Sequence, residues 1–294
     1  MRSPTKIAEP ECYPSTSNPV KLVTHHDLNQ SLLVNTKTPL SMKPLASLLL
    51  ILIFQTISGF SAEPQKTAPS KTDESKEADK EFHTPKRDRK KLKAKSKHIE
   101  GLPNVLIIGD SISVGYTPQI ISDLTGTANV SRIPENGGDT GRGIAKLDKW
   151  LGDKKWDVIH FNWGLWDLCY RHPESKNQGK RDKIRGTQTF TIEQYSKNLE
   201  TLVTKLKATK AKLIWASTTF VPEGEAGRVL GDDHKFNAAA KKIMEKHGIP
   251  INDLNAFSQT IQQHAAKPGD VHFTKTGSKE LGKKVAREIK KQLE

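Results

Sequence analysis

Short strand-like segments alternate with longer helical patterns from about Leu102 to the end of the chain. The strand-like segments are apolar runs, whereas the helical ones place apolar residues on one face, as Tyr195, Leu199 and Leu202 do. Such alternation predicts right-handed βαβ units that build one parallel sheet covered by helices. We expect one domain over residues 100–294. Its expected strands are 104–108, 128–133, 156–162, 212–218 and 250–254, and its expected helices are 118–124, 140–151, 191–207, 233–247 and 276–293.

The first predicted strand runs directly into Gly109 and, after one acidic residue, into Ser111. The continuous apolar run 105–108 is typical of a strand buried on both faces of a parallel sheet. Ser111 then stands at the carboxyl end of this strand, where open α/β sheets build their ligand sites. A serine there is either a helix N-cap or a nucleophile. His272, with Asp270 close to it, precedes the last predicted helix, and this combination indicates acyl transfer.

The N-terminal part of the chain contains a short apolar core that follows Met42 and Lys43. With small residues after it, this core predicts a secretory signal peptide over residues 42–62. A membrane span needs about 20 apolar residues, more than this core offers. Residues 1–41 are polar and without pattern, so we expect Met42 to be the true start and the protein to be exported, periplasmic or extracellular. A membrane-anchored protein with a cytoplasmic tail is the alternative.

Residues 63–99 are rich in Lys, Glu, Ser and Pro and contain few apolar residues. Such a segment cannot bury enough surface to become ordered, so we expect a flexible linker. Between Lys86 and Lys97, eight basic residues are opposed only by Asp88, within a chain of net charge +14. This basic segment would suit an anionic surface or polymer, without specificity for a nucleic acid. The alternative is a solvated linker with no partner.

The two cysteines, Cys12 and Cys169, offer no disulfide inside the domain once the leader is removed. The chain has neither a His-Glu-x-x-His motif nor paired cysteines that would indicate a metal site. Its glycines at 138, 141 and 143 are spaced differently from the dinucleotide-binding fingerprint. We therefore expect no metal and no cofactor.

Four segments in chain order resemble the sequence blocks of the SGNH (GDSL-like) hydrolase superfamily. They are Gly109-Asp110-Ser111-Ile112, Gly138-Asp139-Thr140, Gly164-Leu165-Trp166-Asp167 and Asp270-Val271-His272. The resemblance extends from about Asn104 to Leu293. It implies a three-layer α/β/α flavodoxin-like fold with a five-stranded parallel sheet, and hydrolysis of esters by a serine nucleophile.

By this resemblance, Ser111 is the nucleophile and His272 the base that takes its proton. The backbone N–H groups of Ser111 and Gly138, together with an asparagine amide, would form the oxyanion hole. A serine hydroxyl attacks only with a base beside it, and the developing oxyanion needs preoriented donors. Trp166 occupies the position of the family's asparagine, so we expect Asn162 to supply the amide instead.

The family's acid stands three residues before the histidine, but Gly269 occupies that position here. Asp270 is one residue closer to His272, a shift of roughly 3 Å along an extended segment. We therefore expect its carboxylate to fall short of the ring and a Ser–His dyad to be favoured, with Asp270 as a further catalytic candidate.

The sequence thus predicts an exported serine esterase that acts on an acylated carbohydrate or a small lipid ester. An α/β-hydrolase is excluded because Gly109-Asp110-Ser111-Ile112-Ser113 lacks the last glycine of Gly-x-Ser-x-Gly. Two binding proteins stay as alternatives. One is a degenerate SGNH domain that holds glycans without turnover, and the other is a nucleic-acid or wall-binding protein that uses the basic segment.

Overall fold

The computed structural model describes residues 95–294. The expected N-terminal extension and signal peptide lie outside the described residues, as do the linker and the basic segment up to residue 94. No helix of the described part is long and apolar enough to cross a membrane.

The end of the expected linker contacts the sheet. Lys95 forms an antiparallel bridge with Ser131, and the Ser96 N–H donates to the Val130 carbonyl at 2.8 Å. The contacts of the domain therefore begin at residue 95, before the expected boundary at residue 100.

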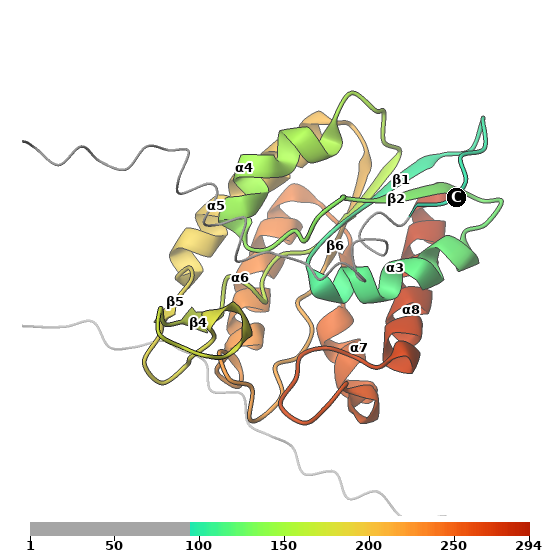
Figure 1. The fold of residues 1–294 in the computed structure, drawn as a ribbon. Helices are drawn as coiled ribbons and strands as arrows, with labels where there is room; N and C mark the ends of the chain where they lie inside the picture. The colour runs from blue at the N-terminus through green and yellow to red at the C-terminus, as the bar shows by residue number, and fades with distance from the viewer. Residues whose placement is uncertain (1–94) are drawn as a thin grey trace, which may run out of the picture. The chain divides into compact units, whose positions relative to one another are not determined.

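Five parallel strands form the central sheet in the order β2-β1-β3-β6-β7, of which Figure 1 labels β1, β2 and β6. They are β1 (Asn104–Ile108), β2 (Asn129–Arg132), β3 (Val158–Phe161), β6 (Lys212–Ala216) and β7 (Ile251–Asn252). β1 pairs with β2 on one side and with β3 on the other, so the order of the strands reverses beside β1. The carboxyl ends of β1 and β3 therefore meet at the switch point, the place where such sheets bind ligands. The predicted parallel sheet is confirmed.

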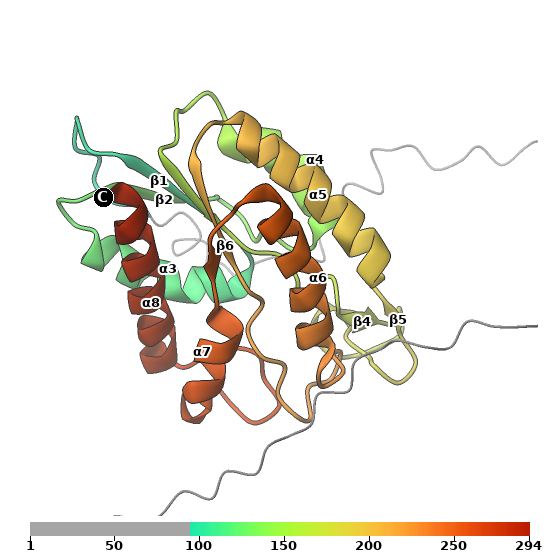
Figure 2. The ribbon, with the colours of Figure 1, turned by 180° about the vertical axis from the view of Figure 1, so that it is seen from behind.

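Helices cover both faces of the sheet (Figures 1 and 2). On one face, α3 (Ser111–Asp123) packs along α8 (Lys275–Leu293), and α7 (Leu254–Thr260) contacts α8. On the other face, α5 (Ile192–Ala208) packs between α4 (Thr140–Leu151) and α6 (Asp232–His247). The arrangement is the expected three-layer α/β/α fold.

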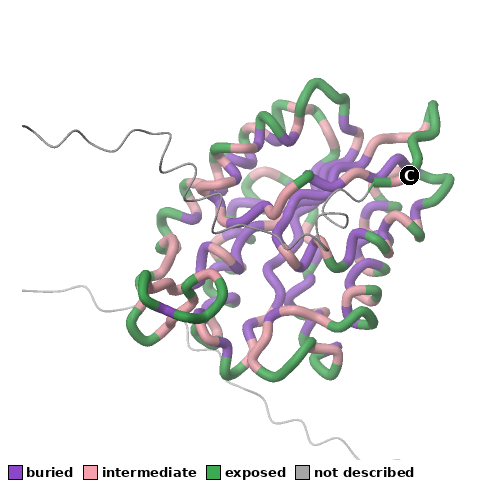
Figure 3. The backbone as a smooth tube through the Cα atoms, in the orientation of Figure 1, coloured by how far each residue is buried: buried purple, intermediate pink, exposed green. Residues whose placement is uncertain are grey.

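The two central strands are buried on both faces, as their apolar sequences predict (Figure 3). Val105, Ile107 and Ile108 of β1 are fully buried, and so is each residue of β3. This set includes His160, whose pKa is lowered to about 3 by burial, so the imidazole is neutral. Its Nε2 lies 3.2 Å from Nδ2 of Asn252 in β7. The rigid central strands hold the loops at their carboxyl ends in place.

Several elements differ from the sequence expectations, among them the last strand, which spans Ile251–Asn252 and not residues 250–254. Helix α3 begins at Ser111 and not at residue 118, because the Asp110 carboxylate caps it by accepting the Ile112 N–H at 2.9 Å. Helix α7 was not expected. The loop 168–190, for which the sequence indicated no secondary structure, contains a small antiparallel sheet and a 3₁₀ turn: β4 (Tyr170–Arg171), η1 (Gln178–Lys180) and β5 (Thr187–Gln188).

Candidate active site

Ser111 is the first residue of α3, directly after the turn that ends β1. The helix is capped by the Asp110 side chain, so the Ser111 hydroxyl is not used as a cap. Its Oγ lies 2.8 Å from Nε2 of His272, although the two residues are 161 positions apart in the chain. The fold therefore brings the expected nucleophile and the expected base into hydrogen-bond contact.

Asp270 reaches the other ring nitrogen of His272. Its Oδ1 lies 2.7 Å from Nδ1 of the ring and also accepts the His272 backbone N–H at 3.1 Å. The side chain of His272 is 45% exposed and that of Asp270 only 17%. The expectation that the carboxylate falls short of the ring is wrong, and the three side chains form a continuous Ser–His–Asp chain.

The local backbone explains why the shifted acid still reaches. Gly269 has a φ of +68°, which bends the segment, whereas the expectation assumed an extended one. The Asp270 side chain then folds back onto the N–H two residues later, the usual hydrogen bond of an Asx turn. Partial burial opposes the charge of Asp270, but hydrogen bonds from the His272 backbone and ring outweigh it and lower the pKa of the carboxyl. Asp270 is therefore ionised at neutral pH.

Two of the three expected oxyanion donors, the Gly138 N–H and the Asn162 amide, already donate to internal acceptors. The Gly137 N–H donates to the Gly109 carbonyl at 3.0 Å, which ties the loop of Gly138 to this turn. The Gly138 N–H itself donates to Oδ1 of Asn136 at 2.9 Å. The Asn162 amide donates to the Ala216 carbonyl at 2.7 Å. A substrate oxyanion would have to compete with these internal acceptors.

Asp167, the acid of the segment Gly164-Leu165-Trp166-Asp167, forms hydrogen bonds with the segment Gly138-Asp139-Thr140. Its fully buried Oδ1 accepts both the backbone N–H of Thr140 at 2.9 Å and the hydroxyl of Thr140 at 2.5 Å. The Asn198 amide of α5 donates to the same hydroxyl at 3.1 Å. Asp167 therefore anchors the start of α4, directly after Gly138.

We expect the free energy of unfolding to depend on pH through the protonation of Asp167. Burial raises the pKa of Asp167 to about 8, and Oδ2 has no hydrogen-bond partner within residues 95–294. Since the unfolded pKa is about 3.9, the stability that the protonated form contributes is complete below about pH 4 and is lost as the pH rises to 8. Asp167→Asn cannot ionise, so its Tm relative to wild type should rise between pH 5 and pH 8. A Tm difference that is constant with pH would contradict this assignment.

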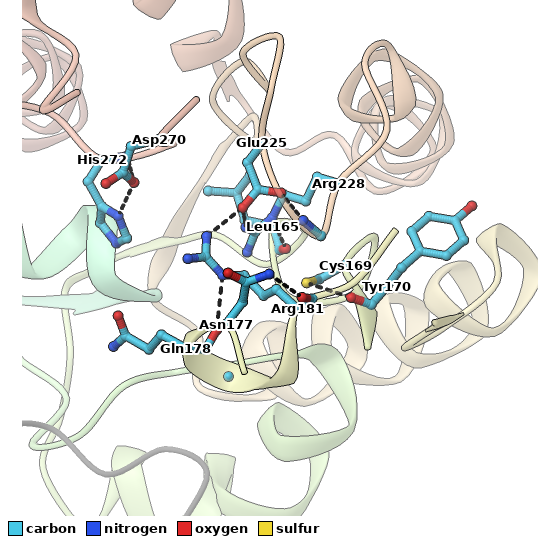
Figure 4. Close-up of polar contacts among 12 residues, drawn as sticks. Leu165, Cys169, Tyr170, Asn177, Gln178, Arg181, Glu225, Arg228, Asp270 and His272 are labelled. Atoms are coloured by element: carbon cyan, nitrogen blue, oxygen red, sulfur yellow. Dashed lines mark hydrogen bonds and ion pairs between the residues drawn. The ribbon is translucent and has the colours of Figure 1, made fainter. Parts of the chain in front are cut away.

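A buried ion cluster that the sequence does not predict lies beside the site (Figure 4). Glu225 is fully buried and accepts from Arg181 of the loop 168–190 and from Nη1 of Arg228 at 3.0 Å. Nε of Arg228 donates to the Leu165 carbonyl at 2.7 Å. The cluster joins three segments: the loop 168–190, the turn at Leu165 and the segment after β6. A Glu and an Arg three residues apart in a loop carry no sequence signal for such a role.

No cluster of His, Cys, Asp or Glu side chains within residues 95–294 is arranged to hold a metal ion. The single described cysteine, Cys169, is buried and unpaired.

No protein-family model and no curated protein matches this sequence. Solved structures do match its fold. A lipase/acylhydrolase from Enterococcus faecalis superimposes with a TM-score of 0.53 at 20% identity, covering 66% of this chain and 98% of that one. The acetylxylan esterase Axe2 from Geobacillus stearothermophilus superimposes with a TM-score of 0.51 at 18% identity, covering 64% and 94%. The fold implied by the resemblance to the SGNH hydrolases is therefore confirmed.

Proposed function

We propose that this chain is a serine esterase of the SGNH type that hydrolyses a carboxylic ester through an acyl-enzyme intermediate. The observation that carries the proposal is the chain of contacts from Ser111 Oγ to His272 Nε2 and from His272 Nδ1 to Asp270. It lies at the switch point of the sheet. The names of the two structural neighbours, an acylhydrolase and an acetylxylan esterase, support an acylated carbohydrate or a small lipid ester as substrate.

The geometry supports a two-step reaction. Ser111 Oγ attacks the ester carbonyl carbon while His272 Nε2 takes the hydroxyl proton, and Asp270 holds the ring by accepting Nδ1–H. Collapse of the tetrahedral intermediate breaks the bond to the alcohol oxygen, which leaves with the proton from His272. Water then attacks the acyl carbon while His272 Nε2 takes a proton from it. The bond from the acyl carbon to Ser111 Oγ breaks, Oγ takes the proton back from His272, and the carboxylic acid is released.

A fluorophosphonate probe tests the proposal directly, because it reacts only with an activated serine. We expect covalent labelling of Ser111, identified by peptide mass spectrometry, together with hydrolysis of 4-nitrophenyl acetate. A glycan-binding domain without turnover would neither label nor hydrolyse.

We expect Asn162, and not Trp166, to provide the side-chain oxyanion donor. One N–H of the Asn162 amide is used by Ala216, and its second one has only a 3.5 Å contact with Thr218 Oγ1. The Trp166 ring is instead covered by the Arg171 guanidinium, 4.6 Å from the ring centroid. Loss of one oxyanion donor costs about 10²–10³ in kcat, so Asn162→Ala should lose about 10².

The matched control is Trp166→Phe, which removes the indole N–H and keeps an aromatic ring. Its kcat on the same aryl ester should stay within about twofold of wild type. The reverse order of effects would transfer the donor role to Trp166.

We further infer that the protein is exported, on the strength of the predicted signal peptide over residues 42–62. The basic segment would then hold the domain near an anionic surface or polymer. N-terminal sequencing of the exported protein checks the first point, with cleavage expected near Ser61 or Ala62.

A further inference from the structure

A buried arginine, Arg132, lies behind the turn that carries Ser111. It is the last residue of the edge strand β2 and is only 5% exposed. A guanidinium has five N–H donors, and each of them is bonded here. Nε donates to Ser113 Oγ at 3.0 Å, Nη1 to the carbonyls of Ile133 at 2.8 Å and Glu135 at 2.9 Å, and Nη2 to the carbonyls of Gly109 at 2.7 Å and Asp110 at 3.1 Å.

These acceptors belong to two segments of the site. One runs from Gly109 to Ser113 and contains Ser111, and the other leads from the end of β2 toward Gly138. The planar guanidinium has a rigid fork geometry, so it fixes the distance and angle between the two segments. The Gly109 carbonyl also accepts the Gly137 N–H at 3.0 Å, which makes it the point where both segments meet.

None of the five groups that accept a hydrogen bond from the Arg132 guanidinium is a carboxylate. Burial lowers its pKa to about 10, which still leaves the guanidinium protonated at neutral pH. A buried charge is unfavourable unless its hydrogen-bonding groups are satisfied, and four carbonyls and a hydroxyl do this here. An apolar side chain would fill the space without the charge, so stability alone does not account for an arginine at this position.

We propose that Arg132 is a positioning residue for the acyl transfer. It holds the Ser111 backbone N–H and the Gly138 loop in the relative placement that the tetrahedral intermediate needs. The proposal rests on the proposed esterase function. It requires no contact between Arg132 and substrate.

The test is Arg132→Lys, which keeps the charge and the aliphatic stem but loses the fork. A lysine has three donors around one nitrogen and cannot span both segments. Small misplacements of catalytic groups cost up to about 10² in rate, so kcat on 4-nitrophenyl acetate should fall about 10- to 100-fold. KM should change less than about threefold, because the effect falls on the transition state. Intact mass after exhaustive fluorophosphonate labelling counts the competent enzyme.

Leu206→Ala is the control for a merely structural effect. Leu206 is fully buried near the C-terminal end of α5, which leads into the amino end of β6, whereas Ser111 follows the carboxyl end of β1. It should lower Tm and leave the kcat of folded enzyme within about twofold of wild type. Equal losses of kcat in Leu206→Ala and Arg132→Lys would overturn the proposal.

Ser113→Ala is a second, milder variant that decides the matter if Arg132→Lys does not fold. It removes the acceptor of Arg132 Nε, and kcat should fall about threefold or more. If Arg132→Lys folds and keeps the wild-type kcat, the positioning role is overturned and the esterase proposal is not. The same holds if Arg132→Lys does not fold and Ser113→Ala keeps the wild-type kcat. A wild-type protein that neither labels at Ser111 nor hydrolyses esters overturns the esterase proposal and this inference together.

Discussion

Replacement of Ser111 by alanine is expected to abolish hydrolysis of a short-chain aryl ester, lowering kcat by up to about 10⁶ if chemistry is limiting. His272→Ala should lose a similar factor, because the serine hydroxyl is a poor nucleophile without a base. The 2.8 Å contact between Oγ and Nε2 places that base where the proton leaves. Steady-state kinetics of the purified variants, with Tm recorded for each, measures the effect.

The double variant supplies the control for this prediction. Side chains that act as one unit lose their contribution once, so Ser111→Ala with His272→Ala should be hardly worse than either single variant. If Ser111→Ala keeps most of its activity, the esterase proposal is wrong.

Asp270→Asn is expected to lower kcat by about 10³–10⁴. The Asp270 carboxylate accepts Nδ1–H of His272 at 2.7 Å, which fixes the tautomer with the free lone pair on Nε2. It also stabilises the imidazolium that forms when Ser111 loses its proton. The corresponding change in a serine protease lowers kcat by about 10⁴, mainly because the asparagine holds the histidine in the wrong tautomer.

Asp253→Asn is the matched control, since Asp253 also uses its Oδ1 in a local turn, where it accepts the Ala256 N–H at 3.0 Å. Asparagine can serve the same cap, so kcat should be unchanged within about twofold. A loss of less than about tenfold in Asp270→Asn would show that Ser111 and His272 work as a dyad.

Local sequence pattern was sufficient for the elements of the sheet. The apolar run 105–108 predicted a strand buried on both faces, and β1 is at most 2% exposed from Val105 to Ile108. The helical spacing of Tyr195, Leu199 and Leu202 predicted α5, whose observed buried face includes all three. Alternation of the two patterns predicted the parallel order, because βαβ connections have one hand.

Helix α3 shows where local reasoning is least secure. The expected helix covered only residues 118–124, with Pro118 at its first position. The helix instead begins at Ser111, because the Asp110 side chain caps it by accepting the Ile112 N–H. Pro118 is tolerated inside it.

The sequence by itself determined the layers of the fold, the position of Ser111 at the end of β1 and its pairing with a late histidine. The layers and the strand end follow from periodicity, which neighbouring residues encode, and the pairing with His272 was inferred from the order of motifs along the chain. Tertiary structure alone decided whether Asp270 reaches the ring, because the answer depends on the bend at Gly269. It alone revealed Arg132 behind the nucleophile turn and the Glu225 cluster, since their partners are hydrogen-bond acceptors and donors from distant segments. Such contacts follow from how packed segments meet in space, which residue spacing along the chain does not encode.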